Sequence, residues 1–545
     1  MNAWKIIDAD PADIEQRFHV SALVARVLKA SELSDEKIEE LLKTDDELKT
    51  SQSECVQKAC RRIIEAKNHN EKVMIAGDYD ADGVCSTAIM KDVLDQLGII
   101  NGYYIPDRFK EGYGLRPETV QKAYDKGYTL IITVDNGVKA LEAIKLAKAL
   151  GIEIIVTDHH QIEEEVPADI LVHPTLMEPE FAYLSGAGTA LEISRFLLHD
   201  CPKHTALAAI AAIGDVMPLY RQTRVIVRNG LRALHDGALP SAAVLVRAGQ
   251  TIDETAVAFQ IVPKLNSVGR MNDISNVNTL VPFLLSTDLL QIQTYAAQLE
   301  TVNTARRTLS ASMADKASAM QTDMDFPVLF DASFHEGLCG LVAGRIANQL
   351  HKPCLVLAES NGLIKGSGRS VPGFNLFAFF SEGFDELSAF GGHEQAVGLS
   401  FPASDLETFC MKVQKKMSAS GFAYQEPEQT AIHIPSEEIT LSNIMDLQIL
   451  SPYPHDIMPP LFAVHDLNAE IVLQSAKVTK YRFAGTGSDF DGVLFKFRNI
   501  DTVENPDWVI GRLSINKWRQ SVRCQIDIEG FEGVVSSNCG KSTKR

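Results

Sequence analysis

Seven acidic and imidazole side chains in the first 215 residues have the types and spacing of a metal site. They occur in four short motifs, and each motif directly follows an apolar run. Oxygen ligands combined with one or two imidazoles suit Mn²⁺ or Mg²⁺ better than a metal that prefers thiolates. The seven residues are Asp78, Asp80, Asp82, Asp135, His159, His160 and Asp215.

The apolar runs that precede these motifs indicate how the side chains come together. Runs of four to eight apolar residues that alternate with helical stretches are typical of buried parallel strands. The carboxyl ends of such strands open onto one crevice, where ligands bind. We therefore expect the polar residues to converge at one edge of a parallel sheet. The four predicted strands cover residues 73–76, 130–134, 152–157 and 206–213.

A purely structural interpretation exists for each acidic residue by itself. A single Asp after a strand is usually a helix N-cap or a turn residue. Three alternating carboxylates at Asp78, Asp80 and Asp82 are different, because like charges at such short separations repel one another and raise each other's pKa. A solvated turn would tolerate them, but this turn follows an apolar run. The whole set therefore favours a bound cation.

Composition limits the class of protein. A chain of 545 residues exceeds one hydrophobic core, so two to four domains are expected. The nine cysteines are scattered without a Cys-x-x-Cys pair, which indicates neither a zinc ribbon nor a disulfide framework and fits the reducing cytoplasm. We expect no signal peptide, no membrane span and, by default, a monomer. The net charge of −19 argues against a nucleic-acid partner unless the substrate path carries local basic patches.

Periodicity divides the chain and predicts an α/β multidomain fold. Residues 286–320 contain neither Pro nor Gly and predict one long linking helix. Short strand-like runs at 469–473, 492–497 and 523–528 predict a small C-terminal β-barrel. The expected parts are a helical lead-in (1–70), a parallel-sheet domain (71–237), a helical connector (238–325), a second α/β domain (326–430), the β-barrel (431–535) and a disordered tail (536–545).

The four motifs, taken in order, resemble those of the DHH phosphoesterase superfamily. They are Asp78-Tyr79-Asp80-Ala81-Asp82-Gly83, Val134-Asp135-Asn136-Gly137, Asp158-His159-His160 and Gly214-Asp215-Val216. Within the superfamily, residues 104–114, 263–270, 366–370 and 390–393 are similar to stretches of the RecJ single-stranded-DNA-specific exonucleases, which carry a DHHA1 domain and an oligonucleotide-binding (OB) fold. The segment 452–460 departs from the family pattern and leaves the seating of the OB fold open.

The resemblance implies two divalent cations, Mn²⁺ or Mg²⁺. Asp80 and Asp135 would hold one cation, with Asp78 contributing either directly or through a water molecule. Asp82, Asp135, His159 and Asp215 would hold the other, so that Asp135 bridges the pair. Asp158 would orient an imidazole, and His160 would face the phosphate and stabilise its developing charge.

The same resemblance implies residues that hold the substrate. Arg369 and Ser367 lie in a glycine-rich segment that suits an anion, although a plain turn would look the same. Arg108, Arg270, Gly391, Gly392 and His393 would complete a 5′-phosphate and backbone grip, with a buried turn as the alternative for His393. In the OB region, Lys480, Arg482 and Trp518 would bind DNA, unless they are ordinary surface residues with Trp518 partly in the core.

These expectations imply a metal-dependent 5′→3′ exonuclease that hydrolyses single-stranded DNA to mononucleotides in DNA repair and recombination. The alternative is a DHH-family phosphodiesterase that acts on short oligoribonucleotides or cyclic dinucleotides. A non-enzymatic scaffold is disfavoured because all the acidic ligands are present. Single-stranded DNA is the expected partner, and a helicase or a single-strand-binding protein is a further candidate. The physiological metal and the strength of the preference for DNA over RNA stay open.

Overall fold

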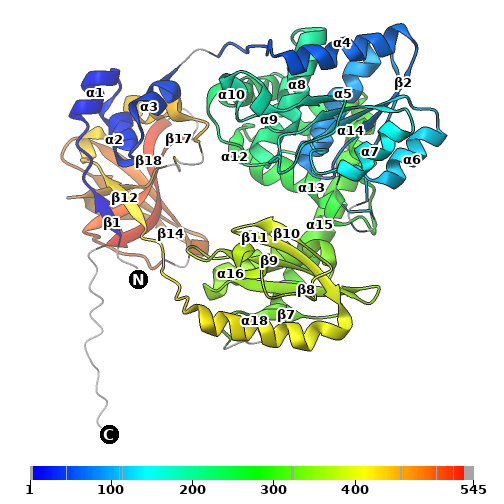
Figure 1. Cartoon of the computed structure of the whole chain (residues 1–545). Helices are drawn as coiled ribbons and strands as arrows, with labels where there is room; N and C mark the ends of the chain where they lie inside the picture. Colours follow the sequence, from blue (N-terminus) through cyan, green and yellow to red (C-terminus); the bar gives the residue numbers. More distant parts are fainter. Residues whose placement is uncertain are drawn as a thin grey trace. The chain divides into compact units, whose positions relative to one another are not determined.

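The computed structural model describes residues 4–43, 46–107, 109, 111–112, 114–320, 324–454, 457, 460–498, 500–518 and 521–532, without the side chains of residues 497, 517 and 518. The chain forms two compact units (Figure 1). Unit 1 combines residues 1–47, 218–225 and 428–545, and unit 2 combines residues 48–217 and 226–427. The fold is a multidomain α/β fold, as the sequence predicts.

The first part of unit 2 is a parallel α/β domain. Its five strands are all parallel and lie in the order β3-β2-β4-β5-β6. The strands are β2 (Lys72–Ala76), β3 (Ile100–Tyr104), β4 (Leu130–Val134), β5 (Glu153–Thr157) and β6 (Ile170–Val172). The helices are α4 (Glu54–Asn68), α5 (Ala81–Gln96), α6 (Pro117–Asp125), α7 (Leu141–Ala149), α8 (Gly186–Leu198) and α9 (Pro202–Gly214). A further helix, α10 (Arg221–His235), begins in unit 1 and continues in unit 2 from residue 226.

Helices cover both faces of this sheet, which explains why its strands are apolar throughout. Successive side chains of a strand point to opposite faces. Val73 and Ile75 of β2 pack into a core with α4, α5, α8 and α9. Met74 and Ala76 pack into a second core with α6 and α7. Because neither face meets water, the continuous apolar runs at these strands are a consequence of the architecture.

The strand order places the first two motifs beside each other. β2 pairs with β3 on one side and with β4 on the other. The strand order of the sheet therefore reverses between β2 and β4. Such a switch point leaves a crevice at the carboxyl ends of the two strands. Asp78 follows β2 and Asp135 follows β4, so both acidic motifs lie at this crevice.

The prediction of a strand at residues 206–213 is wrong, because these residues belong to the helix α9. Residues 206–212 are all buried, so apolar residues follow one another without polar ones between them. Such a run lacks the alternation of polar and apolar residues by which a strand is distinguished from a helix. Five of the eight residues 206–213 are Ala, the residue with the highest helix propensity, and this decides the conformation. Asp215 therefore stands at the C-cap of a helix and not at a strand end.

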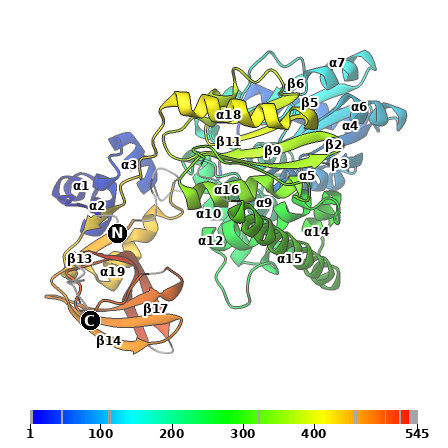
Figure 2. The same cartoon turned by 90° about the horizontal axis from the view of Figure 1, so that it is seen from below.

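The connector of unit 2 is helical and ends in one long helix, as predicted. It contains α11 (Pro240–Ala243), α12 (Glu254–Ala256), α13 (Val262–Arg270), α14 (Leu280–Leu285) and α15 (Leu289–Ala319). The Asp288 carboxylate caps α15 by accepting hydrogen bonds from the N–H groups of Leu290 at 2.9 Å and Gln291 at 3.4 Å. Figure 2 shows α15 as a single extended helix.

The second α/β part of unit 2 has a mixed sheet in the order β10-β11-β9-β8-β7. β7 and β8 are parallel, and the other neighbours are antiparallel. The elements are β7 (Val328–Phe330), α16 (Cys339–Leu350), β8 (Cys354–Ser360), β9 (Leu363–Arg369), α17 (Leu376–Phe380), β10 (Ala389–His393), β11 (Ala396–Pro402) and α18 (Leu406–Ser420).

Unit 1 joins both ends of the chain in one eight-stranded sheet, ordered β1-β12-β13-β17-β18-β16-β15-β14. β1 pairs in parallel with β12. The sequence predicted only helices within residues 1–70, so the strand β1 was not expected. Ser34 caps the helix that follows it, because its hydroxyl accepts the N–H of Lys37. The elements are β1 (Lys5–Ile7), α1 (Ala12–Phe18), α2 (Ala22–Ala30), α3 (Asp35–Leu42), β12 (Thr430–His433), α19 (Leu441–Asp446), β13 (Phe462–His465), β14 (Asn468–Gln474), β15 (Val478–Ala484), β16 (Asp489–Phe495), β17 (Trp508–Trp518) and β18 (Ser521–Glu532).

Two further expectations from the sequence concern the C-terminal tail and membrane-spanning helices. The tail expected to be disordered, residues 536–545, lies outside the described residues. Among the helices of the described part, none combines the length and the hydropathy that a membrane span requires.

Candidate active site

The first acidic motif is a tight loop between β2 and α5. A Cβ atom at Gly83 would lie 2.5 Å from the carbonyl oxygen of Asp78, so only glycine lets the loop fold back this closely. The Asp80 carboxylate caps α5 by accepting the N–H groups of Asp82 at 3.0 Å and Gly83 at 3.1 Å. The loop thus holds its carboxylates against the first turn of the helix.

Asp82 is buried and is held by a helix that the sequence analysis did not connect with the site. Its two carboxylate oxygens accept the N–H groups of Gly186 and Ala187, both at 2.7 Å. These groups form the N-terminus of α8, which stabilises a negative charge. The glycine-rich start of α8 was the only signal in the sequence. A Cβ atom at Gly186 would lie 2.5 Å from the Cβ of Asp135.

His159 lies at the centre of the acidic motifs. Its Nε2 is 3.2 Å from Oδ1 of Asp135, 3.6 Å from Oδ2 of Asp215 and 3.7 Å from Oδ2 of Asp82. Asp135 reaches this position with a left-handed backbone, φ 60°, directly after β4. Residues from β4, β5 and the ends of α5 and α9 therefore meet at one point, although up to 133 positions separate them in the chain.

The donor atoms form overlapping groups that fit divalent cations. Within each group, the ligand atoms lie within 4.8 Å of one another. Asp135 belongs to two of the groups, which is the arrangement that a bridging carboxylate needs. Carboxylates with an imidazole are a donor set that suits Mn²⁺ or Mg²⁺. The groups are Asp78-Asp80-Asp135, Asp82-His159-Asp215 and Asp135-His159-His160.

The electrostatics of these groups also favour a cation. Burial and the charge of Asp82 raise the pKa of Asp80. Burial, followed by the charges of Asp82 and Asp80, holds the pKa of Asp135 well above its usual range. Burial and the same two charges raise the pKa of Asp215 to about 7. Of these three groups Asp135 is buried, Asp80 is partly buried and Asp215 is exposed at the surface. Carboxylates crowded in this way keep their charge when a cation neutralises them.

Asp158 and His160 form a separate pair beside the acidic cluster. His160 Nδ1 donates to the Asp158 carboxylate at 2.7 Å, and the N–H of Val138 donates to the same carboxylate at 3.0 Å. Burial lowers the pKa of His160, but the bond to Asp158 outweighs it, so the pKa lies above the ordinary value. Burial lowers the pKa of His159, which favours the neutral form that ligates metal. His173, which the sequence analysis missed, donates Nε2–H to the His160 carbonyl at 2.9 Å.

The second sheet carries five of the predicted substrate residues on two strands, β9 and β10, which both pair with β11. Arg369 on β9 lies opposite Ala396 on β11, which lies opposite His393 on β10. In the same way, Ser367 on β9 lies opposite Gly398 on β11, which lies opposite Gly391 on β10. Gly392 lies between Gly391 and His393 on β10. Residues directly opposite each other, and those two apart on a strand, share a sheet face. Ser367, Arg369, Gly391 and His393 therefore lie on one face.

A helix N-terminus adjoins this face. Arg369 Nη1 donates to Ser367 Oγ at 3.0 Å. A Cβ atom at Gly340, in the first turn of α16, would lie 2.9 Å from Arg369 Nη2 and from Ser367 Oγ. The glycine thus lets both polar groups reach the start of the helix, where anions are favoured. Of the other predicted phosphate ligands, Arg270 is the last residue of α13, and Arg108 lies outside the described residues.

In unit 1, successive side chains of β15 alternate between exposed and buried, which separates the predicted DNA-binding residues from the core. Lys480 and Arg482 are exposed on one face, whereas Tyr481 between them is fully buried and stacks on Phe483. Tyr481 is therefore a core residue and cannot stack on a base. The side chain of Trp518 lies outside the described residues. Lys480 lines a hollow of about 780 Å³ with Lys477, Lys496 and Phe495.

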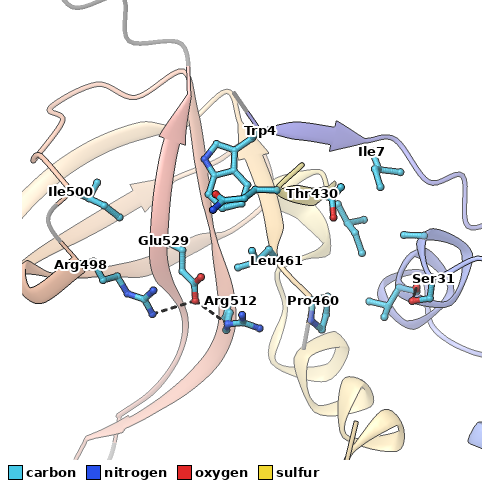
Figure 3. A pocket seen from close by; sticks show the side chains of 14 residues that line it. Trp4, Ile7, Ser31, Thr430, Pro460, Leu461, Arg498, Ile500, Arg512 and Glu529 are labelled. Carbon is cyan, nitrogen blue, oxygen red and sulfur yellow. Dashed lines mark hydrogen bonds and ion pairs between the residues drawn. The ribbon is translucent and has the colours of Figure 1, made fainter. Parts of the chain in front are cut away.

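Unit 1 has a second hollow, of about 720 Å³, that no sequence motif indicated (Figure 3). Trp4 and the β12 strand line it on one side, and Arg498 and Arg512 line it on the other. Both arginines donate to Oε1 of Glu529, at 3.2 Å and 2.9 Å. The hollow shares no residue with the acidic cluster of unit 2.

Comparisons with known proteins match the chain almost end to end. The DHH family, N-terminal domain, matches residues 72–214, the DHHA1 domain matches 323–419 and the RecJ OB domain matches 430–530. The single-stranded-DNA-specific exonuclease RecJ of Bacillus subtilis is 32% identical over 96% of this chain and 70% of its own length. RecJ from Thermus thermophilus in complex with Mn²⁺ has a TM-score of 0.82 and 25% identity over 97% of this chain and 79% of that one. RecJ from Thermus thermophilus in complex with Mg²⁺ has a TM-score of 0.73 and 23% identity over 97% of this chain and 78% of that one.

Proposed function

This chain belongs to the RecJ family of single-stranded-DNA-specific exonucleases, and from that premise we propose a 5′→3′ polarity and a two-cation centre of Mn²⁺ or Mg²⁺. It is a single-stranded-DNA-specific exonuclease of the DHH phosphoesterase family. The observation that carries the proposal is the position of Asp135 in two donor groups at once. We propose that Asp78, Asp80 and Asp135 hold one cation, and that Asp82, Asp135, His159 and Asp215 hold the other.

Two cations bound there would polarise the attacked phosphate and lower the pKa of a water molecule. The chain's own residues position the reactants. Asp158 holds the His160 ring through Nδ1. We assign to this oriented ring the role of donor to a phosphate oxygen, where it would stabilise the developing charge. The raised pKa of His160, due to Asp158 despite burial, favours this donor form. Hydrolysis would then release mononucleotides from the strand end, which suits a role in DNA repair and recombination.

The domain limits proposed from the sequence are supported by overlap with the family matches. The DHH domain is proposed at 71–237, the DHHA1 domain at 326–430 and the OB domain at 431–535, against matched ranges of 72–214, 323–419 and 430–530. Residues 1–47 pack with the OB part in unit 1, so we propose that they support the OB fold and are not a free lead-in.

A substrate panel tests the proposed function directly. The purified protein, with Mn²⁺ or Mg²⁺, is incubated with single-stranded DNA labelled at either end, duplex DNA, short RNA and cyclic dinucleotides. We expect cleavage of single-stranded DNA only, with a 5′ label released first as a mononucleotide. Release of a 3′ label first would refute the polarity. A preference for short RNA or cyclic dinucleotides would favour the alternative phosphodiesterase.

Arg369→Ala is expected to reduce the preference for a 5′-phosphate over a 5′-hydroxyl end by about tenfold, roughly one charged hydrogen bond of 1.5 kcal/mol. The reason is that Arg369, Ser367 and the N-terminus of α16 form the anion-binding face of the second sheet. The measurement is kcat/KM on the two kinds of oligonucleotide. Arg345→Ala on the same helix α16 is the control, since Arg345 is exposed and pairs with Asp315. An unchanged preference in Arg369→Ala would refute the role.

The double variant Lys480→Ala/Arg482→Ala is expected to raise KM on long single strands severalfold and to leave kcat unchanged. Both side chains are exposed on β15, outside the unit that holds the acidic cluster, so they contribute binding only. Each lost phosphate contact lowers the slope of log K against log salt by about 0.7 for single strands. KM is measured at several salt concentrations, with Lys148→Ala on α7 as the control. Equal salt slopes for the variant and the parent would contradict the prediction.

A further inference from the structure

The connector helix α13 lies directly against the first acidic motif. Asn266 Oδ1 accepts the N–H of Ala81 at 2.7 Å. One turn further along, a Cβ atom at Gly269 would lie 2.7 Å from the carbonyl oxygen of Tyr79, so the helix touches the same loop again. Tyr79 and Ala81 flank the proposed metal ligand Asp80. The helix therefore supports the loop that carries three of the proposed ligands, although no step of the proposed cleavage uses it.

The end of α13 contacts the DHHA1 domain. A Cβ atom at Gly337 would lie 2.3 Å from the carbonyl oxygen of Arg270, a distance that no Cβ atom can adopt. Met271, the next residue, is buried in the hydrophobic core of the second sheet and its helices. The same Cβ atom would lie 2.6 Å from Cζ of Phe109, which belongs to the DHH segment between β3 and α6. Three segments that are distant in the chain therefore meet at Gly337.

His335 holds this junction together. Its ring lies edge-on to the ring of Phe109, with centroids 5.7 Å apart. Nδ1 of His335 accepts the N–H of Gly337 at 3.1 Å, and Nε2 donates to Oδ1 of Asp273 at 3.2 Å. Lys365 on β9 donates to the carbonyl oxygen of Phe109 at 3.4 Å. These contacts join the DHH segment, the chain just after α13 and the DHHA1 domain.

The junction at Gly337 leads directly into the proposed phosphate grip. α16 begins at Cys339, and its first turn adjoins Arg369 and Ser367. The chain itself cannot fix the position of this grip, because it reaches the DHHA1 domain through α15, a helix of 31 residues and about 46 Å. A slight bend at one end of such a helix displaces its other end. The spacing between the grip and the acidic cluster therefore depends on noncovalent contacts such as those at Gly337.

On the basis of the proposed function, we propose that α13 and the junction at Gly337 determine the length of the product. The acidic cluster cuts a phosphodiester bond while the DHHA1 face holds the 5′ phosphate, so the distance between the two decides how many nucleotides leave together. A mononucleotide product requires one short and fixed distance. Gly337 and His335 are thus positioning residues, which act through this distance and not through contact with the strand.

Gly337→Ala tests the spacing without changing a proposed metal or phosphate ligand. Its methyl group meets a backbone carbonyl, so α13 and the DHHA1 domain must move apart. On a single strand with a radiolabelled 5′ phosphate, the first product carries the label, and its length is read on a gel. We expect the ratio of labelled dinucleotide to mononucleotide to rise at least tenfold. Gly344→Ala on α16 is the matched control, with parental product lengths expected, since its Cβ would meet only Arg369 Cγ, at 3.8 Å.

His335→Ala is a second variant that adds no bulk and decides the matter where Gly337→Ala does not fold. It removes the ring from Phe109 and the bonds to Gly337 and Asp273, so we expect the same ratio to rise at least threefold. The Mn²⁺ affinity of both variants, measured by calorimetry, should stay within twofold of the parent, because the contacts they change lie outside the acidic loop. A merely destabilising substitution would lower the rate and leave the product at one nucleotide.

The parent protein separates this inference from the function on which it rests. A parent that releases no labelled mononucleotide refutes the proposed function, and the inference with it. A parent that releases mononucleotides, together with folded variants that release mononucleotides alone, overturns only the positioning role of Gly337 and His335. Longer products from the variants at parental Mn²⁺ affinity support it.

Discussion

Asp135→Asn is expected to reduce cleavage of single-stranded DNA by at least about a thousandfold, a barrier increase of about 4 kcal/mol. Asp135 belongs to two donor groups, so the loss of its charge weakens both proposed cation positions together. Asparagine is the informative replacement because Asp135 has a left-handed backbone with φ 60°, which asparagine adopts easily and alanine does not. A loss of activity then reports the missing charge and not a distorted loop.

The measurement for Asp135→Asn is kcat on a 5′-phosphorylated single strand, together with bound Mn²⁺ by calorimetry and the unfolding midpoint. The thermal midpoint of the metal-free variant should not fall, since removing one of several crowded buried carboxylates relieves repulsion. Asp125→Asn at the exposed end of α6 is the control, with parental activity expected. Activity of Asp135→Asn within about tenfold of the parent, only about 1.4 kcal/mol, would refute the bridging role.

Gly186→Ala is expected to reduce activity by at least about a hundredfold, or about 2.7 kcal/mol, although glycine itself binds nothing through a side chain. The new Cβ would lie 2.5 Å from the Cβ and 2.6 Å from Oδ1 of Asp135, which forces that carboxylate or α8 to move. Any movement of α8 also displaces the N–H of Gly186 from Asp82. One added methyl group therefore disturbs two proposed ligands.

Gly214→Ala serves as the matched comparison for Gly186→Ala, because it lies beside another proposed ligand, Asp215. The closest neighbours of its Cβ would be methyl groups of Val262, at 3.1 Å and 3.3 Å, which can shift slightly. We expect less than a tenfold loss of kcat in this variant. Both variants are assayed for cleavage and for Mn²⁺ affinity. Equal activities of the two variants would mean that the close approach of α8 to Asp135 does not matter for catalysis.

The donor atoms of the acidic centre were predictable from the sequence, because short local patterns specify them. An apolar strand followed by Gly77 and three alternating carboxylates indicates a loop at a strand end, and the structure shows this loop. The same holds for Asp135 after β4 and for His159 after β5. In each case the strand and its polar end lie within about ten residues, so the sequence contains the whole signal.

The contacts that position those donors were not predictable, because they join distant segments. The N–H groups that hold Asp82 come from residues more than a hundred positions away, and the carbonyl of His160 is held by His173 from beyond the next strand. Neither partner has a residue type that indicates its role. Only the packing of α8 against α5 creates the first contact, and backbone N–H groups leave no trace in composition.

The sequence by itself determined the family, the parallel sheet, the long helix α15 and the residues of the acidic cluster, since motif order and local periodicity carry them. The tertiary structure alone decided three further points. Residues 206–213 form a helix because complete burial erases the periodicity that would identify one. Tyr481 is core and Lys480 is exposed because register, not residue type, assigns the two faces of β15. Finally, β1 pairs with β12 across more than 400 positions, a contact that depends on chain topology and that no local pattern encodes.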